Sequence, residues 1–156
     1  MEHFNKLITL LIAIQNFCKD IHYSCHGESF YSKHLFVDRI QKNLNEYVDQ
    51  IKEVCFLGND ETPLASGEYL SRATSLIPLL EDTDLKNFVS LGKILLDTLE
   101  CIDTMTGLTK GEDNLMGTIA QDLQNSVGLL NLQVKNDKAH NALEQSKSRV
   151  FTRGHS

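Results

Sequence analysis

The sequence lacks any apolar run of about 18 residues, which is the length that a helix needs to span a lipid bilayer. The apolar stretch at residues 7–14 resembles the core of a signal peptide. No positively charged segment precedes it, however, and no small-residue cleavage site follows it. We therefore expect a cytoplasmic protein without a membrane segment, in which this stretch forms a buried helix.

Closely paired cysteines are also missing. The four cysteines lie inside helical patterns, without the short spacings that mark a disulfide framework. We expect free, buried thiols in a reducing compartment. The four residues are Cys18, Cys25, Cys55 and Cys101.

An excess of positive charge is absent as well. The 15 lysines and arginines stand against 21 aspartates and glutamates, which gives a formal net charge of −6. Such a surface does not wrap nucleic acid by its overall charge, and it suits cations better. Residues 137–156 carry four basic and two acidic side chains, so this segment could still touch DNA phosphates, but DNA binding is not favoured.

Apolar residues recur at helical spacing through most of the chain. The steps of three and four residues define four segments, and no strand pattern competes with them. The four segments are residues 7–21, 29–57, 85–105 and 115–134. Residues 58–67 have the composition of a turn, but the apolar residues that follow, such as Tyr69 and Ile77, predict a short helix within this long connection.

These patterns predict an all-α protein with a ferritin-like four-helix bundle. The links within the first and the second helix pair are short, whereas the crossover between the pairs is long enough for the second pair to run alongside the first. A chain of 156 residues fits one domain. We expect the bundle in residues 1–136 and a polar, flexible C-terminal tail in residues 137–156.

The second helical segment carries two pairs of possible metal ligands. His34 and Asp38 are four residues apart, and so are Asp49 and Glu53, so each pair projects from one patch of helix surface. The fifteen residues from His34 to Asp49 separate the pairs by roughly 22 Å along a helix. Each pair is therefore half of a site, and one helix cannot close it.

The ligand candidates face away from the apolar side of the same segment. At about 100° per residue they fall within a stripe of roughly 100°, whose centre lies about 135° from that of the apolar residues. Tyr31, Leu35 and Phe56 lie on or beside this stripe, where a protein surface would cover them better than water. Two antiparallel copies of the segment would bring unlike pairs together twice, as in a two-fold dimer.

His22 is placed to complete the nitrogen side, because it lies near the end of the first helix and can fold back beside the start of the second. The set then holds two imidazoles and three carboxylates, which suit iron in both oxidation states better than a closed zinc site. We expect iron at a site formed by His22, His34, Asp38, Asp49 and Glu53.

These residues resemble the pattern of the DNA-protection-during-starvation (Dps) family, which is His, then Gly-x-x-Phe-x-x-x-His-x-x-x-Asp, then Asp-x-x-x-Glu. The crossover resembles the family as well, in Thr62-Pro63-Leu64 and Glu68-Tyr69-Leu70. The resemblance is specific over residues 20–77 and only architectural over residues 85–135. The pattern reads His22, Gly27, Phe30, His34, Asp38, Asp49 and Glu53 here.

The resemblance implies a ferroxidase within a hollow homo-oligomer, a dodecamer built from two-fold dimers. Such an oligomer oxidises Fe(II) with hydrogen peroxide or oxygen, stores the ferric product and so protects against oxidative damage. The resemblance also implies that His22, His34 and Asp38 come from one subunit, and Asp49 and Glu53 from its neighbour. No Glu-x-x-His occurs in the sequence, so the usual di-iron motif of ordinary ferritins is excluded.

Three positions depart from the family pattern. Tyr23 follows the first histidine where most relatives have tryptophan, and the chain has no tryptophan at all. Gly128 lies near the position that tryptophan usually fills in the last helix, and Val54 follows Glu53 in place of a small and basic pair. These departures bear on the efficiency of oxidation more than on the ligand set.

Other interpretations of the polar residues stay open. Cys18, His22 and Cys25 share a helix face, with His26 nearby, and could hold zinc instead of packing in the core. The protein could also be a ferritin-like structural or DNA-binding shell with weak or no ferroxidase activity.

Acidic residues gather at or near the start of the fourth helix. Relatives build acidic entry pores around three-fold axes in this part of the chain. Carboxylates also favour helix N-termini because of the helix dipole, which explains Glu112 and Asp113 equally well. The pore hypothesis involves Glu112, Asp113 and Asp122.

Overall fold

The first helix, α1 (Glu2–Ser24), lies at the centre of the fold because apolar side chains cover most of its circumference. It contacts α2, α3, α4 and α5 in the computed structural model, which describes residues 1–27 and 30–154, and of residues 144 and 148–154 only the backbone. The core residues of α1 are buried almost completely, among them Leu7, Ile8, Leu11, Ile14, Phe17 and Ile21.

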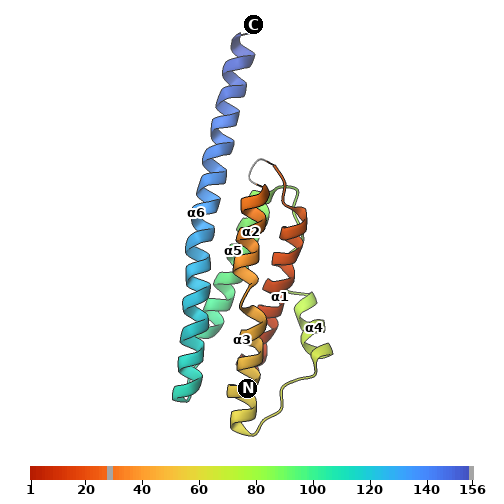
Figure 1. Cartoon of the computed structure of the whole chain (residues 1–156), viewed down its shortest axis with the longest axis vertical. Coiled ribbons are helices and arrows are strands. Elements are labelled where there is room, and N and C mark those ends of the chain that lie inside the picture. The colour runs from red at the N-terminus through yellow and green to blue at the C-terminus, as the bar shows by residue number, and fades with distance from the viewer. Residues whose placement is uncertain (28–29, 155–156) are drawn as a thin grey trace.

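Four helical rods lie side by side in the bundle (Figure 1). They are α1, the consecutive pair α2 (Phe30–Gln41) and α3 (Leu44–Ile51), α5 (Asp84–Asp103), and α6 (Lys110–Gly154). No strand occurs in the described part of the chain. The expected all-α class and four-helix arrangement are therefore confirmed.

The second rod is not the single helix that the sequence predicted over residues 29–57. A turn at residues 42–43 separates α2 from α3, and a π-helical turn (Lys52–Phe56) and a 3-10 turn (Leu57–Asn59) follow α3. Apolar spacing misses such breaks because π and 3-10 turns change the rotation per residue without interrupting the pattern. The two ligand pairs thus lie on different helical pieces.

The long crossover carries the expected short helix, α4 (Ser66–Thr74), which packs on the outside of α1 (Figure 1). Tyr69 anchors it, since this side chain is only 1% exposed. Its hydroxyl donates to Asn5 Oδ1 at 2.7 Å and accepts the Leu64 N–H at 3.1 Å. The predicted crossover helix is therefore confirmed, with Tyr69 as its apolar anchor, although the helix ends before Ile77.

The last helix runs much further than expected. α6 has 45 residues against 20 in α5, and its C-terminal half extends beyond the other helices (Figure 1). The predicted helical segment ended at residue 134, and a flexible tail was predicted in residues 137–156, but the helix continues to Gly154. Ala139, Ala142 and Leu143 are good helix formers, and no proline or glycine interrupts the segment before Gly154.

No helix in the described part of the chain is both long enough and apolar enough to cross a membrane.

The anchoring of α4 can be tested with Tyr69→Phe. The substitution leaves the buried Asn5 oxygen and the Leu64 N–H without a partner, which costs about 1–3 kcal/mol of unfolding free energy. Urea denaturation at one fixed protein concentration measures the loss, because assembly makes stability depend on concentration.

Tyr23→Phe is the matched control, since Tyr23 is 82% exposed. It should change the unfolding free energy by no more than about 0.5 kcal/mol. Equal effects of the two substitutions would contradict the assigned role of Tyr69.

Candidate metal centre

The turn between α1 and α2 brings the two candidate histidines together. Gly27 adopts φ +91°, a left-handed conformation that favours glycine, and here the chain reverses direction. His22 in the last turn of α1 then stacks on His34 of α2, with ring centroids 3.3 Å apart. The first half of the predicted site is thus assembled within one chain, as the sequence analysis expected of His22.

Hydrogen bonds fix the orientation of both imidazoles. His34 Nδ1 lies 2.8 Å from the carbonyl oxygen of His22, and His22 Nδ1 lies 3.2 Å from that of His34. Asp38 Oδ1 also approaches His22 Nδ1, at 3.1 Å. Because all three partners are acceptors, each Nδ1 carries the proton when the ring is neutral, and the Nε2 lone pair then remains for a metal ion. Histidine ligands commonly have such partners at the other ring nitrogen.

Asp38 has two possible roles in this half-site. Its Oδ1 orients the ring of His22, and the side chain as a whole is 48% exposed. The described part of the chain places no hydrogen-bond donor on Oδ2. Asp38 therefore orients a ligand within its own subunit and still presents one oxygen outward.

An ion pair that the sequence analysis missed holds the start of α2. Asp84, the first residue of α5, accepts the His26 N–H at 3.1 Å and the Lys33 ammonium group at 2.9 Å. The side chains of Asp84 and Lys33 are only 8% and 13% exposed. The pair fixes Lys33, and with it the neighbouring His34. No spacing rule links these residues, because 51 positions separate Lys33 from Asp84.

The second half of the predicted site lies at the other end of the rod. Asp49 is in the last turn of α3 and Glu53 is in the π-helical turn, and both are exposed. Neither carboxylate forms an ion pair or a side-chain hydrogen bond within the described residues. π-Turns are enriched at functional sites, so the irregular backbone at Glu53 fits a ligand position.

The two halves do not meet in one chain. Among the described residues, no group of three or more His, Cys, Asp or Glu side chains could hold a metal ion. The cluster of His22, His34 and Asp38 is therefore incomplete by itself, and so is the pair of Asp49 and Glu53. A site made from these five residues needs a second molecule.

Exposed apolar side chains accompany both halves. Tyr31 and Leu35 beside the histidines are 70% and 49% exposed, and Leu57 beyond the π-turn is 64% exposed. The sequence predicted that Phe56 lies on this outward surface as well. That prediction was wrong, because Phe56 is only 2% exposed and contacts the ring of Phe4. The wider π-turn rotates Phe56 into the core, which a regular helix would not do.

The structure contradicts the zinc hypothesis. Cys18 is fully buried, and the Cys25 thiol faces the carbonyl oxygens of His22 and Phe30. Burial raises the pKa of both thiols, which opposes the thiolate form that binds zinc. All four cysteines are free and buried, as expected.

Two of the three acidic residues of the pore hypothesis are used inside the bundle. Glu112 accepts hydrogen bonds from the Thr109 N–H and from Asn59. Burial alone would raise the pKa of Glu112, but these bonds outweigh it and hold the pKa below its usual value. Asp122 accepts the Tyr47 hydroxyl at 2.7 Å, and burial together with this bond raises the pKa of Tyr47 to about 12. Of the three, only Asp113 is exposed.

A solved structure shares this fold. It is the crystal structure of an archaeal Dps homologue from Halobacterium salinarum, which matches with a TM-score of 0.60. The match covers 89% of this chain and 77% of that chain, at 20% sequence identity. Neither a protein-family model nor a curated protein matches the sequence. The likeness confirms the expected ferritin-like four-helix fold.

The orientation of the histidines can be tested by ¹⁵N NMR of histidine-labelled, metal-free protein near pH 8. His22 and His34 should both be protonated at Nδ1 and unprotonated at Nε2, because their Nδ1 atoms face acceptors only. Addition of Zn²⁺ as a redox-inert probe should then shift the Nε2 resonances.

Asp38→Asn serves as the control variant. It removes the carboxylate beside His22 but leaves the bond from His34 to the backbone, so only the His22 signals should change. A His34 ring protonated at Nε2 instead of Nδ1 would contradict the assignment.

Proposed function

We propose that the protein is a Dps-like mini-ferritin, a ferroxidase that oxidises Fe(II) at sites shared by two subunits. In this proposal His22, His34 and Asp38 come from one subunit, and Asp49 and Glu53 come from its neighbour. The ferric product is stored in a hollow homo-oligomer, a dodecamer built from two-fold dimers. The observation that carries the proposal is the presence of two partial ligand sets at opposite ends of the second rod, neither of which is completed within the described residues of one chain.

The ligand chemistry supports iron as the substrate. Neutral imidazoles bind ferrous iron, and carboxylates stabilise the ferric product. Two Fe(II) ions lose one electron each, and hydrogen peroxide takes both electrons as its O–O bond breaks. Two protons are consumed, and two water molecules form. Oxygen is the alternative oxidant.

The exposed apolar side chains support a subunit interface over the same surface. A large aromatic side chain such as Tyr31 gains free energy when another protein surface covers it. In an antiparallel two-fold pair, the histidine end of one rod faces the carboxylate end of the other, and two equivalent sites form. The roughly 22 Å between His34 and Asp49 then separates two sites instead of dividing one.

Mixed oligomers test this arrangement. His34→Ala disables the histidine half, and Glu53→Ala disables the carboxylate half, so each variant alone should lose rapid Fe(II) oxidation. A dimer with one subunit of each kind has one site with both defects and one intact site. Random reassembly of equal amounts should therefore restore about one quarter of the wild-type rate. The rate of Fe(II) oxidation is measured by stopped-flow absorbance after peroxide is added to anaerobic, Fe(II)-loaded protein.

Two controls accompany the experiment. Glu46→Ala removes another exposed carboxylate from α3 and should leave the rate unchanged. A double variant, His34→Ala with Glu53→Ala in the same chain, should not be rescued by either single variant, because neither mixture can form an intact site. Absence of rescue between the single variants, with oligomers of normal size, would refute shared sites. Undiminished oxidation by His34→Ala would refute the ligand assignment.

A further inference from the structure

A hollow lined by both polar and apolar side chains lies beside Asp49, between α1, α3 and the start of α4. Its volume is about 240 Å³, which is below the usual range of pockets for drug-sized molecules and suits a small ion with a few waters. Its charged lining residues are Lys19, Lys52 and Asp49, so the lining carries one net positive charge.

The two lysines have no acidic partner. Among the described residues, neither Lys19 nor Lys52 forms an ion pair, although the chain is acidic overall. Lys52 Nζ lies 5.3 Å from the ring centroid of the buried Tyr69, which steadies its position by a cation–π contact. Both lysines line the hollow together with Asp49, so an anion bound there is attracted by two ammonium groups and repelled by one carboxylate.

Further hydrogen-bond donors line the same hollow. The side chains of Gln15, Asn45 and Ser66 form no hydrogen bond within the described residues. Ser66 is also the first residue of α4, where backbone N–H groups of a helix have no partner in the helix. Ammonium groups, amides, a hydroxyl and a helix N-terminus together make a set of donors suited to an oxyanion.

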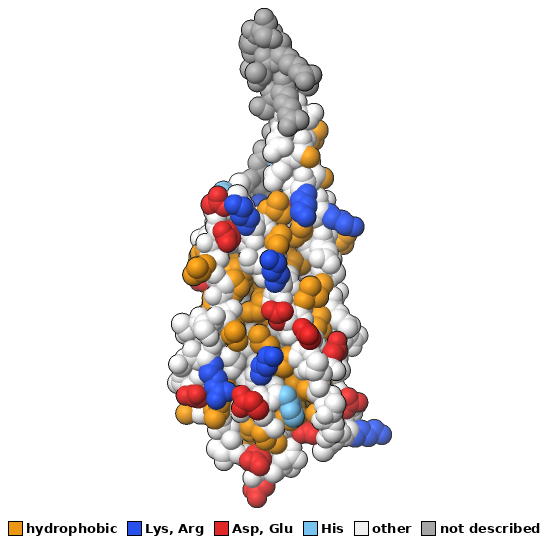
Figure 2. All heavy atoms as spheres, turned by 180° about the vertical axis from the view of Figure 1, so that it is seen from behind, with side chains coloured by type: hydrophobic (Ala, Val, Ile, Leu, Met, Phe, Trp, Pro, Cys, Tyr) orange, Lys and Arg blue, Asp and Glu red, His pale blue; other side chains and the backbone are white. Residues whose placement is uncertain are grey.

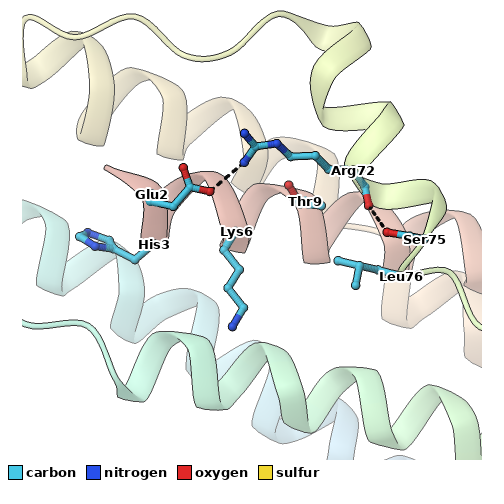
Figure 3. A pocket seen from close by; sticks show the side chains of 7 residues that line it. All are labelled: Glu2, His3, Lys6, Thr9, Arg72, Ser75 and Leu76. Carbon is cyan, nitrogen blue, oxygen red and sulfur yellow. Dashed lines mark hydrogen bonds and ion pairs between the residues drawn. The ribbon is translucent and has the colours of Figure 1, made fainter.

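Another hollow, about 370 Å³ in volume, has a different character. It is lined by residues of α1 and the end of α4, and its arginine, Arg72, points to Glu2 (Figure 3). Arg72 is already bound to both Glu2 and Glu68, at 2.7 and 3.2 Å. Figure 2 shows the molecule from behind, where charges of both signs alternate with apolar side chains. In the hollow beside Asp49, by contrast, neither of the two lysines forms an ion pair among the described residues.

The position of the lysines matters for the function proposed above. Positive charge next to Asp49 opposes the binding of Fe(II) at the carboxylate half of the site. A phosphate ion with about two negative charges near neutral pH would change the charge of the hollow from +1 to about −1. The same ion would then attract the metal that the bare lysines repel.

We propose that this hollow binds inorganic phosphate or a similar small tetrahedral oxyanion, and that the bound anion strengthens Fe(II) binding at the adjacent Asp49 and Glu53. Lys19 and Lys52 are the binding residues, with Asn45 and Ser66 as additional donors. The effect on iron rests on the proposed function, whereas the binding of phosphate does not. The coupling is reciprocal, so a metal ion at the site also strengthens phosphate binding.

Binding of phosphate is tested first, by calorimetric titration of the metal-free oligomer. Lys19→Gln with Lys52→Gln should weaken phosphate binding at least about tenfold, since charge-assisted bonds to two ammonium groups are lost. Lys93→Gln with Lys110→Gln is the matched control, because it removes the same charge from exposed lysines elsewhere. Undetectable phosphate binding, or equal weakening in both double variants, would overturn the inference and leave the ferroxidase proposal standing.

Asp49→Asn separates the two proposals within one variant. It removes the negative charge that faces the lysines, so phosphate should bind about two- to tenfold more tightly while rapid Fe(II) oxidation is lost. Tighter binding with unchanged oxidation would refute the ligand role of Asp49 and support the anion site. Weaker phosphate binding would overturn the anion site.

The coupling is tested with Co²⁺ as an oxygen-stable probe, from its visible absorption at the site. Phosphate should raise the apparent Co²⁺ affinity severalfold in the wild-type oligomer and leave it unchanged in the Lys19→Gln, Lys52→Gln variant. Co²⁺ affinity that does not respond to phosphate in the wild-type protein would overturn the coupling.

Discussion

A helix holds its side chains at fixed intervals, and this rigidity is the constraint on which the candidate site depends. A rise of about 1.5 Å per residue keeps ligands on distant turns apart, whatever rotamers they adopt. His34 and Asp49 belong to the same rod and cannot reach a common ion. Only His22 is brought next to His34 within one chain, because the tight turn at Gly27 folds α1 back against α2. In the proposed site, Asp49 and Glu53 therefore come from a second copy of the chain.

Much of the surrounding structure keeps the histidine half rigid before any metal arrives. The two imidazoles exchange hydrogen bonds with each other's backbone, and the buried pair of Lys33 and Asp84 ties the start of α2 to α5. Such partners set the direction of the ring nitrogens. The carboxylate half has no comparable support, since Asp49 and Glu53 are exposed and lie near the irregular end of the rod. The proposed site would thus join a preorganised half to an adaptable one.

The sequence predicted the fold class, the crossover helix and the closeness of His22, His34 and Asp38, because all of these follow from local periodicity and from one glycine turn. It missed the breaks in the second rod, since Asn43 and the π-turn leave the apolar spacing almost intact. The inward rotation of Phe56 follows from the same π-turn. The pairing of Lys33 with Asp84 depends on tertiary packing alone. The length of α6 was underestimated because polarity was taken as a sign of flexibility, although residues such as Ala139 and Leu143 favour a helix.

The length of α6 has a consequence for any closed assembly. A helix of 45 residues extends about 65 Å, roughly twice the span of α5. The C-terminal half of α6 cannot pack against the other helices of its own subunit, and in a symmetric assembly every subunit has the same projecting helix. In a closed assembly, neighbouring subunits must leave space for the C-terminal half of each α6. That half can point outward, point into the central cavity or lie along an interface between subunits. The permitted angles between subunits are therefore fewer than the bundle alone would allow.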